Sequence, residues 1–263
     1  MRLLVTNDDG IRAPGIAALA GALVGAGHEV VVAAPEDDRS GAGAAIGGMH
    51  ADESIALRPV ELEGLEAATC YAVAASPALI TIAACLGAFG TAPDAVVSGI
   101  NAGANTGRAV LHSGTVGAAL TAANFGRSGL AVSLAVGGEP QWATPAQAAV
   151  AALEWLARQP DATVVNFNLP NRSLAEVGGV RQGFLAPFGT VRAAIVEASA
   201  GLQVELVGDG DGGEGSGEAA PDGSDTALVR AGFASVTVLS GVVAVDSPGA
   251  AEAVERRLPV GTG

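Results

Sequence analysis

The sequence predicts an α/β fold with a mostly parallel β-sheet. Its 263 residues suit one large domain, or one domain with a smaller appendage. About half of the residues are apolar (49%), which is enough for a substantial core. Short apolar runs alternate with alanine-rich segments along most of the chain, as strands and helices alternate in α/β proteins.

The first 35 residues predict a complete strand–helix–strand unit. Leu3–Thr6 is a short apolar run, typical of a central strand that is covered on both faces. The next segment is rich in alanine and leucine, begins at Pro14 and ends at Gly25, and proline and glycine mark the two ends of a helix. EVVVAAP at 29–35 is a second apolar strand, so the two strands are expected to be parallel with a right-handed crossover.

The same alternation continues through the middle of the chain. The patterns predict helices at 76–89, 114–126 and 144–159, the last with Thr144 as its cap, and strands at 93–99, 130–136 and 163–170.

The last third of the chain changes character. Two strand-like segments at 191–198 and 202–208 predict a hairpin. The stretch from 208 to 225 is glycine-rich and acidic with few side chains that can pack, so it predicts a mobile loop that either gates a site or is solvated decoration. The remaining segments predict a helical turn at 227–232, a strand at 234–240 and a closing helix at 248–258.

The chain is strongly acidic, with 27 acidic and 13 basic residues and a net charge of −14; every basic residue is arginine. Such a charge repels phosphate backbones at long range, so no stable nucleic-acid partner is expected. A small anionic substrate remains compatible with this charge, because a bound cation inverts the local field.

The cysteines and apolar segments point to the cytoplasm. Cys70 and Cys85 have neither disulfide-framework nor zinc-motif spacing, so two reduced thiols are expected. The chain starts directly with a strand rather than with a signal segment. The apolar stretch at 67–92 is interrupted by turn residues such as Pro77, which favours a packed helix over a membrane span.

Oxygen-bearing side chains follow three of the predicted strands. Asp8 and Asp9 follow the first, Ser40 the second, and Asn101 the strand at 93–99. In open parallel sheets ligands bind at the carboxyl ends of strands, and oxygen donors of this kind suit Mg²⁺ or Mn²⁺. Asp8-Asp9-Gly10 alone is more often a turn, but the joint placement favours a cation site.

Ser113, Gly114 and Thr115 stand where the helix at 114–126 should begin. Helix N-termini offer free N–H groups and a positive dipole end, which together bind anions such as phosphate. The alternative is a plain N-cap by Ser113 or Thr115, and both roles can hold at once.

Other phosphate-handling folds agree less well with these residues. Phospho-receiver domains need a lysine, which the chain lacks, and haloacid-dehalogenase-type phosphatases separate their two acids by one residue. Gly41 and Gly43 form only part of a dinucleotide-binding fingerprint, and they follow the second strand instead of the first. A non-catalytic, metal-dependent nucleotide-binding protein stays open as an alternative.

Four segments follow one another along the chain: VTNDDGIRAPGIAAL, VVVAAPEDDRSGAG, PDAVVSGINAGAN and HSGTVGAAL. Together they resemble the SurE family of metal-dependent 5′/3′-nucleotidases, also called stationary-phase survival proteins. NFNLP at 166–170 and the stretch at 224–239 are similar to later blocks of the family, so the resemblance spans nearly the whole chain.

The resemblance implies a Rossmann-like three-layer αβα sandwich. It implies a catalytic core at 1–175, followed by a C-terminal part at 176–263 with a hairpin, an acidic loop, a final strand and a helix that is used in forming a homodimer or homotetramer. The residues that it assigns to the metal are Asp8, Asp9, Ser40 and Asn101, and those that it assigns to the substrate phosphate are Asn105, Ser113, Gly114 and Thr115.

The implied activity is hydrolysis of nucleoside 5′- and 3′-monophosphates to nucleoside and phosphate, with one Mg²⁺ or Mn²⁺ per subunit. Either Asp8 or Asp9 can act as the base, and a covalent aspartyl-phosphate route stays open. His112 stands where many members carry tyrosine, so either a proton or hydrogen-bond donor or a packing role is expected for it.

Overall fold

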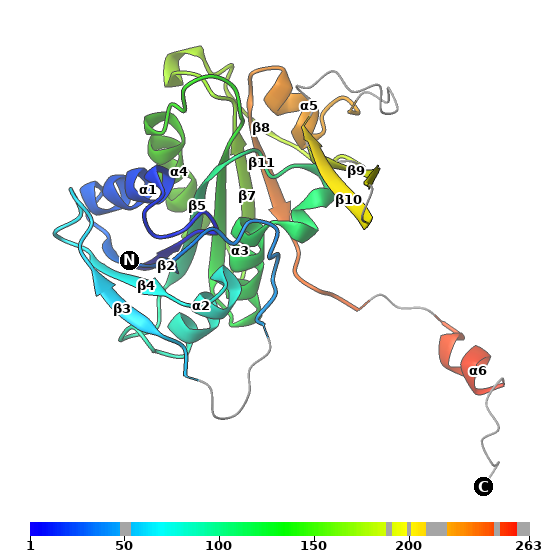
Figure 1. Ribbon diagram of the computed structural model, residues 1–263, viewed down its shortest axis with the longest axis horizontal. Helices are drawn as coiled ribbons and strands as arrows, with labels where there is room; N and C mark the ends of the chain where they lie inside the picture. The colour runs from blue at the N-terminus through cyan, green and yellow to red at the C-terminus, as the bar shows by residue number, and fades with distance from the viewer. Residues whose placement is uncertain (48–53, 188–190, 199–200, 209–219, 245–247, 257–263) are drawn as a thin grey trace, which may run out of the picture.

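Nine strands form one sheet in the computed structural model (Figure 1), which describes residues 1–263 except 48–53, 188–190, 199–200, 209–219, 245–247 and 257–263. The order across the sheet is β3-β4-β2-β1-β5-β6-β7-β11-β8, and β9 and β10 form a separate pair. The strands of the large sheet are β1 (Arg2–Thr6), β2 (Glu29–Pro35), β3 (Leu57–Val60), β4 (Thr69–Val73), β5 (Ala95–Ala102), β6 (Ser128–Leu134), β7 (Val164–Leu169), β8 (Val180–Gln182) and β11 (Ala234–Leu239).

Helices cover both faces of the sheet, which confirms the predicted α/β fold (Figure 1). Helices α1 and α4 pack together on one face, and α2 and α3 pack together on the other. The helices are α1 (Pro14–Gly25), α2 (Pro77–Cys85), α3 (Gly114–Asn124), α4 (Ala143–Leu156), α5 (Asp225–Arg230) and α6 (Ala250–Glu255), with short 3₁₀ helices η1 (Gly107–His112) and η2 (Leu174–Glu176).

The central part of the sheet is parallel, as predicted. Strands β4, β2, β1, β5, β6 and β7 run in one direction. Strand β3 pairs antiparallel to β4, and β11 pairs antiparallel to β7 and parallel to β8. From β1 the chain moves to β2 and β4 on one side and then returns to β5 on the other. The carboxyl ends of β1 and β5 therefore form the switch point at which α/β sheets bind ligands.

Strand β1 lies at the centre because it is apolar on both faces. Leu3 and Val5 belong to the core beneath α1 and α4, and Leu4 belongs to the core beneath α2. All three side chains are at most 1% exposed. Burial of this kind stabilises a strand by roughly 1.5–3 kcal/mol per large apolar side chain, so the start of the chain is firmly anchored.

The structure corrects two details of the predicted elements. The apolar stretch at 67–92 is not a single helix: it contains β4 and then α2, and β3 and β4 were not predicted. Thr144 does not cap α4, because the helix already begins at Ala143 with Trp142 before it, and Thr144 is buried in its first turn.

Two expectations from composition agree with the structure. Cys70 and Cys85 are both free. Within the described ranges, no helix is both long enough and apolar enough to cross a membrane.

The C-terminal third contributes to the same sheet as the rest of the chain. Strands β9 (Val191–Ala198) and β10 (Gly201–Gly208) pair antiparallel, which confirms the predicted hairpin strands. The acidic loop predicted at 208–225 lies mainly outside the described residues, since 209–219 are not described. Beyond it, α5 packs on β11, and β11 and β8 extend the sheet past β7.

Candidate functional site

A tight turn at the end of β1 displays the two adjacent aspartates. The side chain of Asn7 is fully buried; its Nδ2 donates to the Gly10 carbonyl at 3.0 Å, and its Oδ1 accepts from the Gly10 N–H at 3.2 Å. Gly10 has φ +100°, a conformation that few other residues adopt. The amide of Asn7 thus closes a loop around Asp8 and Asp9, and both carboxylates are presented at the carboxyl edge of the sheet.

Asp8 is held by the first turn of α3. Its Oδ2 accepts from the Gly114 N–H at 3.1 Å, and its Oδ1 accepts from the Thr115 hydroxyl at 2.5 Å. Ser113 caps the helix, with its Oγ accepting from the Val116 N–H at 3.1 Å. The predicted anion-binding helix start therefore binds an anion of this chain itself, the carboxylate of Asp8.

Two glycines of α3 allow this close packing. A Cβ on Gly114 would lie 2.7 Å from both Cβ and Oδ2 of Asp8. A Cβ on Gly117 would lie 2.5 Å from the Gly43 carbonyl oxygen, so the loop after β2 also lies on this turn of α3. The N–H of Gly43 donates to the carbonyl of His112 at 3.1 Å, which fixes that loop to the end of η1. The side chain of His112 is exposed.

The loop after β2 brings Ser40 to the same edge. The Arg39 N–H donates to the Asp8 carbonyl at 2.7 Å. Ser40 is exposed, and its N–H and its hydroxyl donate to Asp38 Oδ1 at 2.7 and 2.6 Å. Because the hydroxyl proton is committed to Asp38, the lone pairs of Ser40 Oγ remain for a cation. Asp38 was not predicted as part of the site, although an aspartate often accepts a hydrogen bond from the backbone two residues further on.

Asp9 is bound from the β5 side. The backbone N–H of Ala102, the residue after Asn101, favours the charged form of the Asp9 carboxylate and so acts to lower its pKa. The Nδ2 of Asn101 donates to the Gly103 carbonyl at 2.8 Å, so Oδ1 is the atom that this side chain can offer to a cation. Burial, and then the negative charge of Asp8, raise the pKa of Asp9 to about 6. Burial also raises the pKa of Asp8, although hydrogen bonds from Thr115 oppose that effect.

Asn105 lies over the neighbouring strands β6 and β7. Its Nδ2 donates to the Ser133 hydroxyl at 2.9 Å, and its backbone is held by Asn166 and Asn168. These two asparagines belong to the NFNLP segment and were not predicted as supports of the site. The hydrogen bonds of the structure thus connect Asp8 with Gly114, Thr115 and the Ser40 loop. The pKa of Asp9 is affected by Ala102, beside Asn101, while Asn105 is fixed separately.

The donor set fits a hard divalent cation. The two described ion pairs, Arg2–Glu29 and Arg58–Glu36, lie elsewhere, so no arginine neutralises Asp8 or Asp9 in the described part of the chain. Adjacent buried carboxylates with raised pKa values are stabilised by a cation between them. Within the described ranges, no three side chains of His, Cys, Asp or Glu lie close enough together to hold a metal. Asp8 and Asp9 are therefore the two carboxylates that a cation would find at this site. Ser40 and Asn101 would have to supply the remaining oxygen ligands.

The raised pKa of Asp9 predicts that cation binding depends on pH. A proton on Asp9 competes with the cation, so the affinity of the metal-free protein for Mn²⁺ should fall by about tenfold for each pH unit below about 6. Calorimetric titration with Mn²⁺ between pH 4.5 and 7.5 measures this dependence. An affinity that stayed constant across that range would remove Asp9 from the cation site.

The same pKa has a consequence for stability without metal. The folded protein holds the Asp9 proton more tightly than the unfolded chain does, since the pKa is about 6 instead of 3.8. Its contribution to stability is therefore complete below pH 3.8 and is lost as the pH rises through about 6. At pH 7.5, metal-free Asp9→Asn protein should be more stable than the parent by at most about 3 kcal/mol, and at pH 4 the two should unfold alike.

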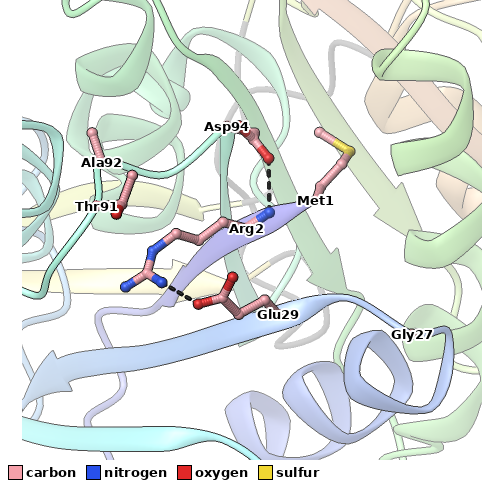
Figure 2. Close-up of a pocket in the computed structure, with 7 residues that line it drawn as sticks. All are labelled: Met1, Arg2, Gly27, Glu29, Thr91, Ala92 and Asp94. Atoms are coloured by element: carbon pink, nitrogen blue, oxygen red, sulfur yellow. Dashed lines mark hydrogen bonds and ion pairs between the residues drawn. The ribbon is translucent and has the colours of Figure 1, made fainter.

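A hollow lies at the opposite, amino-terminal end of the strands (Figure 2). It has a volume of about 410 Å³, and the charged side chains that line it have partners. The guanidinium of Arg2 pairs with Glu29 and also donates to the Phe89 carbonyl at 2.9 Å, and the Arg2 N–H donates to Asp94 at 2.7 Å. These contacts tie β1 to β2 and to the segment before β5.

Comparisons with known proteins relate most of the chain to one family. A family profile described as "Survival protein SurE" matches residues 3–194, which include every predicted site residue. The chain is 42% identical over 184 residues to the 5′-nucleotidase SurE of Xanthomonas campestris pv. campestris (strain B100), covering 68% of this chain and 67% of that protein. The 5′-nucleotidase SurE of Xanthomonas oryzae pv. oryzae (strain PXO99A) is 41% identical over the same length.

A solved structure shares the fold over almost the whole chain. The crystal structure of the Sure protein from Aquifex aeolicus superposes with a TM-score of 0.76 at 25% sequence identity. The match covers 98% of this chain and 100% of the other.

Proposed function

Because this chain belongs to the SurE family, we propose that it hydrolyses nucleoside monophosphates to a nucleoside and inorganic phosphate. Relatives that bear the name 5′-nucleotidase SurE support action on 5′-monophosphates, and we extend the proposal to 3′-monophosphates. The observation that carries it is the pair Asp8 and Asp9 at the switch point between β1 and β5, which has no basic partner among the described residues.

We propose that Asp8, Asp9, Ser40 and Asn101 hold one Mg²⁺ or Mn²⁺. When bound, such a cation lowers the pKa of water and neutralises charge on phosphoryl oxygens. Asp8 is fixed by two hydrogen bonds from α3 and is suited to holding the cation in one place. Asp9 is less buried, with a pKa near 6, and is the better candidate to accept a proton from the attacking water.

The substrate phosphate is proposed to bind between Asn105 and the start of α3. Asn105 uses one N–H of its Nδ2 on Ser133 and retains a second for a phosphoryl oxygen. Ser113, Gly114 and Thr115 form the positive end of α3, whose field favours an anion nearby. Gly114 and Thr115 already bind Asp8, so they would act on phosphate binding indirectly. They would do so through the dipole of the helix and by orienting the Asp8 carboxylate.

The proposal is tested by phosphate release from nucleoside 5′- and 3′-monophosphates with Mn²⁺ or Mg²⁺. We expect release that a chelator stops and that added metal restores. Absence of release from every nucleotide, together with retained nucleotide binding, would identify a non-catalytic binding protein instead. Release that persists in excess chelator would contradict the cation site.

A homodimer or homotetramer is proposed from the family resemblance, with the C-terminal region at 176–263 in the subunit contacts. Size-exclusion chromatography with light scattering measures the subunit number. A monomer at assay concentrations would contradict this part of the proposal without affecting the proposed chemistry.

A further inference from the structure

Two fully buried asparagines of β7 bind the backbone of one residue of the site. Asn168 Oδ1 accepts from the Asn105 N–H at 2.7 Å, and Asn168 Nδ2 donates to the Asn105 carbonyl at 3.0 Å. Asn166 Nδ2 donates to the same carbonyl at 2.8 Å. The two side chains are 0% exposed and lie two residues apart, so they point to the same face of the strand.

A third polar side chain joins them from the neighbouring strand. Ser133 of β6 pairs with Asn168 across the sheet, is 0% exposed, and accepts from Asn105 Nδ2 at 2.9 Å. The N–H, the carbonyl and the side chain of Asn105 are therefore all held by β6 and β7. Residue 105 cannot shift without breaking several hydrogen bonds, each of which has a fully buried partner on β6 or β7.

This arrangement is costly for the core. Asn166 Oδ1 is buried and has no hydrogen-bond partner in the described part of the chain. A buried polar atom without a partner destabilises the folded state, and an apolar side chain at this strand position would avoid that cost. Asn166 and Asn168 lie 61 and 63 residues from Asn105 in the sequence, so their hydrogen bonds to it are not part of a local turn or cap.

We propose that Asn166 and Asn168 are positioning residues, which orient Asn105 for binding the substrate phosphate. This inference rests on the proposed function, in which the second N–H of Asn105 Nδ2 meets a phosphoryl oxygen. Because the backbone and one N–H of Asn105 are already fixed, the remaining donor is aimed before the substrate arrives. Misplacement of such a group by about 1 Å lowers rates by about 100-fold.

The test is a double-mutant cycle between Asn168→Ala and Asn105→Ala. Each single variant should lower kcat/KM for a nucleoside monophosphate by roughly 10- to 100-fold. The double variant should be no worse than Asn105→Ala, because Asn168 acts only through Asn105. Losses that multiply in the double variant would overturn the proposal, since they would show that Asn168 acts independently.

Thr237→Val is the matched control. Thr237 lies on β11 opposite Asn166, is 4% exposed, and its hydroxyl has no hydrogen-bond partner in the described residues. This variant should keep kcat/KM within about twofold, although it alters the same buried face. If Asn168→Ala does not fold, Asn166→Ala removes a single donor to the Asn105 carbonyl and enters the same cycle.

A second measurement separates this proposal from the proposed function. The same cycle is run on the dissociation constant of inorganic phosphate by calorimetry. If the parent protein binds phosphate but hydrolyses no nucleotide, the proposed function fails and the phosphate cycle alone decides the role of Asn168. A parent protein that does neither overturns both proposals.

Discussion

Asp8→Asn is expected to lower kcat/KM for nucleoside monophosphates by about 10³-fold or more and to weaken Mn²⁺ binding in parallel. Removing an outer-shell partner of a metal ligand typically costs about 10- to 100-fold, and the loss of a charged ligand should exceed that. The two oxygens of Asp8 accept hydrogen bonds from the Gly114 N–H and the Thr115 hydroxyl. The side chain of asparagine has a single oxygen, so it cannot replace both acceptors. Steady-state kinetics and Mn²⁺ calorimetry measure the two effects.

The control for this variant is Asp37→Asn, which removes an exposed carboxylate from the loop after β2. It changes the net charge of the protein by the same amount and should leave kcat/KM within about twofold. Thermal unfolding of metal-free Asp8→Asn should not show a large loss, because burial already disfavours the charged form of Asp8. Retained activity in Asp8→Asn would show that another group holds the cation.

Gly114→Ala is expected to disable the site by displacing Asp8. The added Cβ would lie 2.7 Å from Asp8 Oδ2, a separation that Cβ atoms do not adopt, so the carboxylate or the helix start must move. Overpacking of this kind costs about 1–3 kcal/mol of stability. The displaced carboxylate should lower kcat/KM by about 100-fold or more.

Gly25→Ala is the matched glycine substitution. Gly25 is the last residue of α1, and a Cβ there would meet no atom within 4 Å. It should leave activity unchanged and raise stability slightly, by about 0.4–1 kcal/mol. If Gly114→Ala retained full activity, the close contact between α3 and Asp8 would have no bearing on catalysis.

Much of the central architecture could be predicted because it depends on local signals. Leu3–Thr6 and Glu29–Pro35 are apolar runs bounded by turn residues, and Pro14 and Gly25 mark the ends of α1. The strand-end rule then places Asp8 and Asp9 at one edge without any knowledge of side-chain contacts. β3 and β4 were missed because Leu57–Val60 is largely exposed and Thr69–Val73 merges with an apolar helix.

The supports of the site could not be predicted, since they join residues far apart in sequence. Thr115 stands where a helix cap is expected, yet its hydroxyl donates to the carboxylate of Asp8, 107 residues away. In the sequence, Asn166 and Asn168 are only two polar residues within a predicted strand. Their contact with Asn105 exists only in the folded sheet. Hydrophobic periodicity identifies elements, but it carries no information on which buried polar groups become partners.

The carboxylate of Asp225, the first residue of α5, affects how the protein folds during its synthesis. Asp225 is 0% exposed, and its carboxylate accepts from the N–H groups of Gly107 and Ala186 at 2.8 and 3.0 Å. The first of these bonds holds the segment that leads from Asn105 to Ser113. The predicted site residues, at positions 8 to 115, leave the ribosome before residue 225 does. Until residue 225 has also emerged, the nascent chain lacks this anchor.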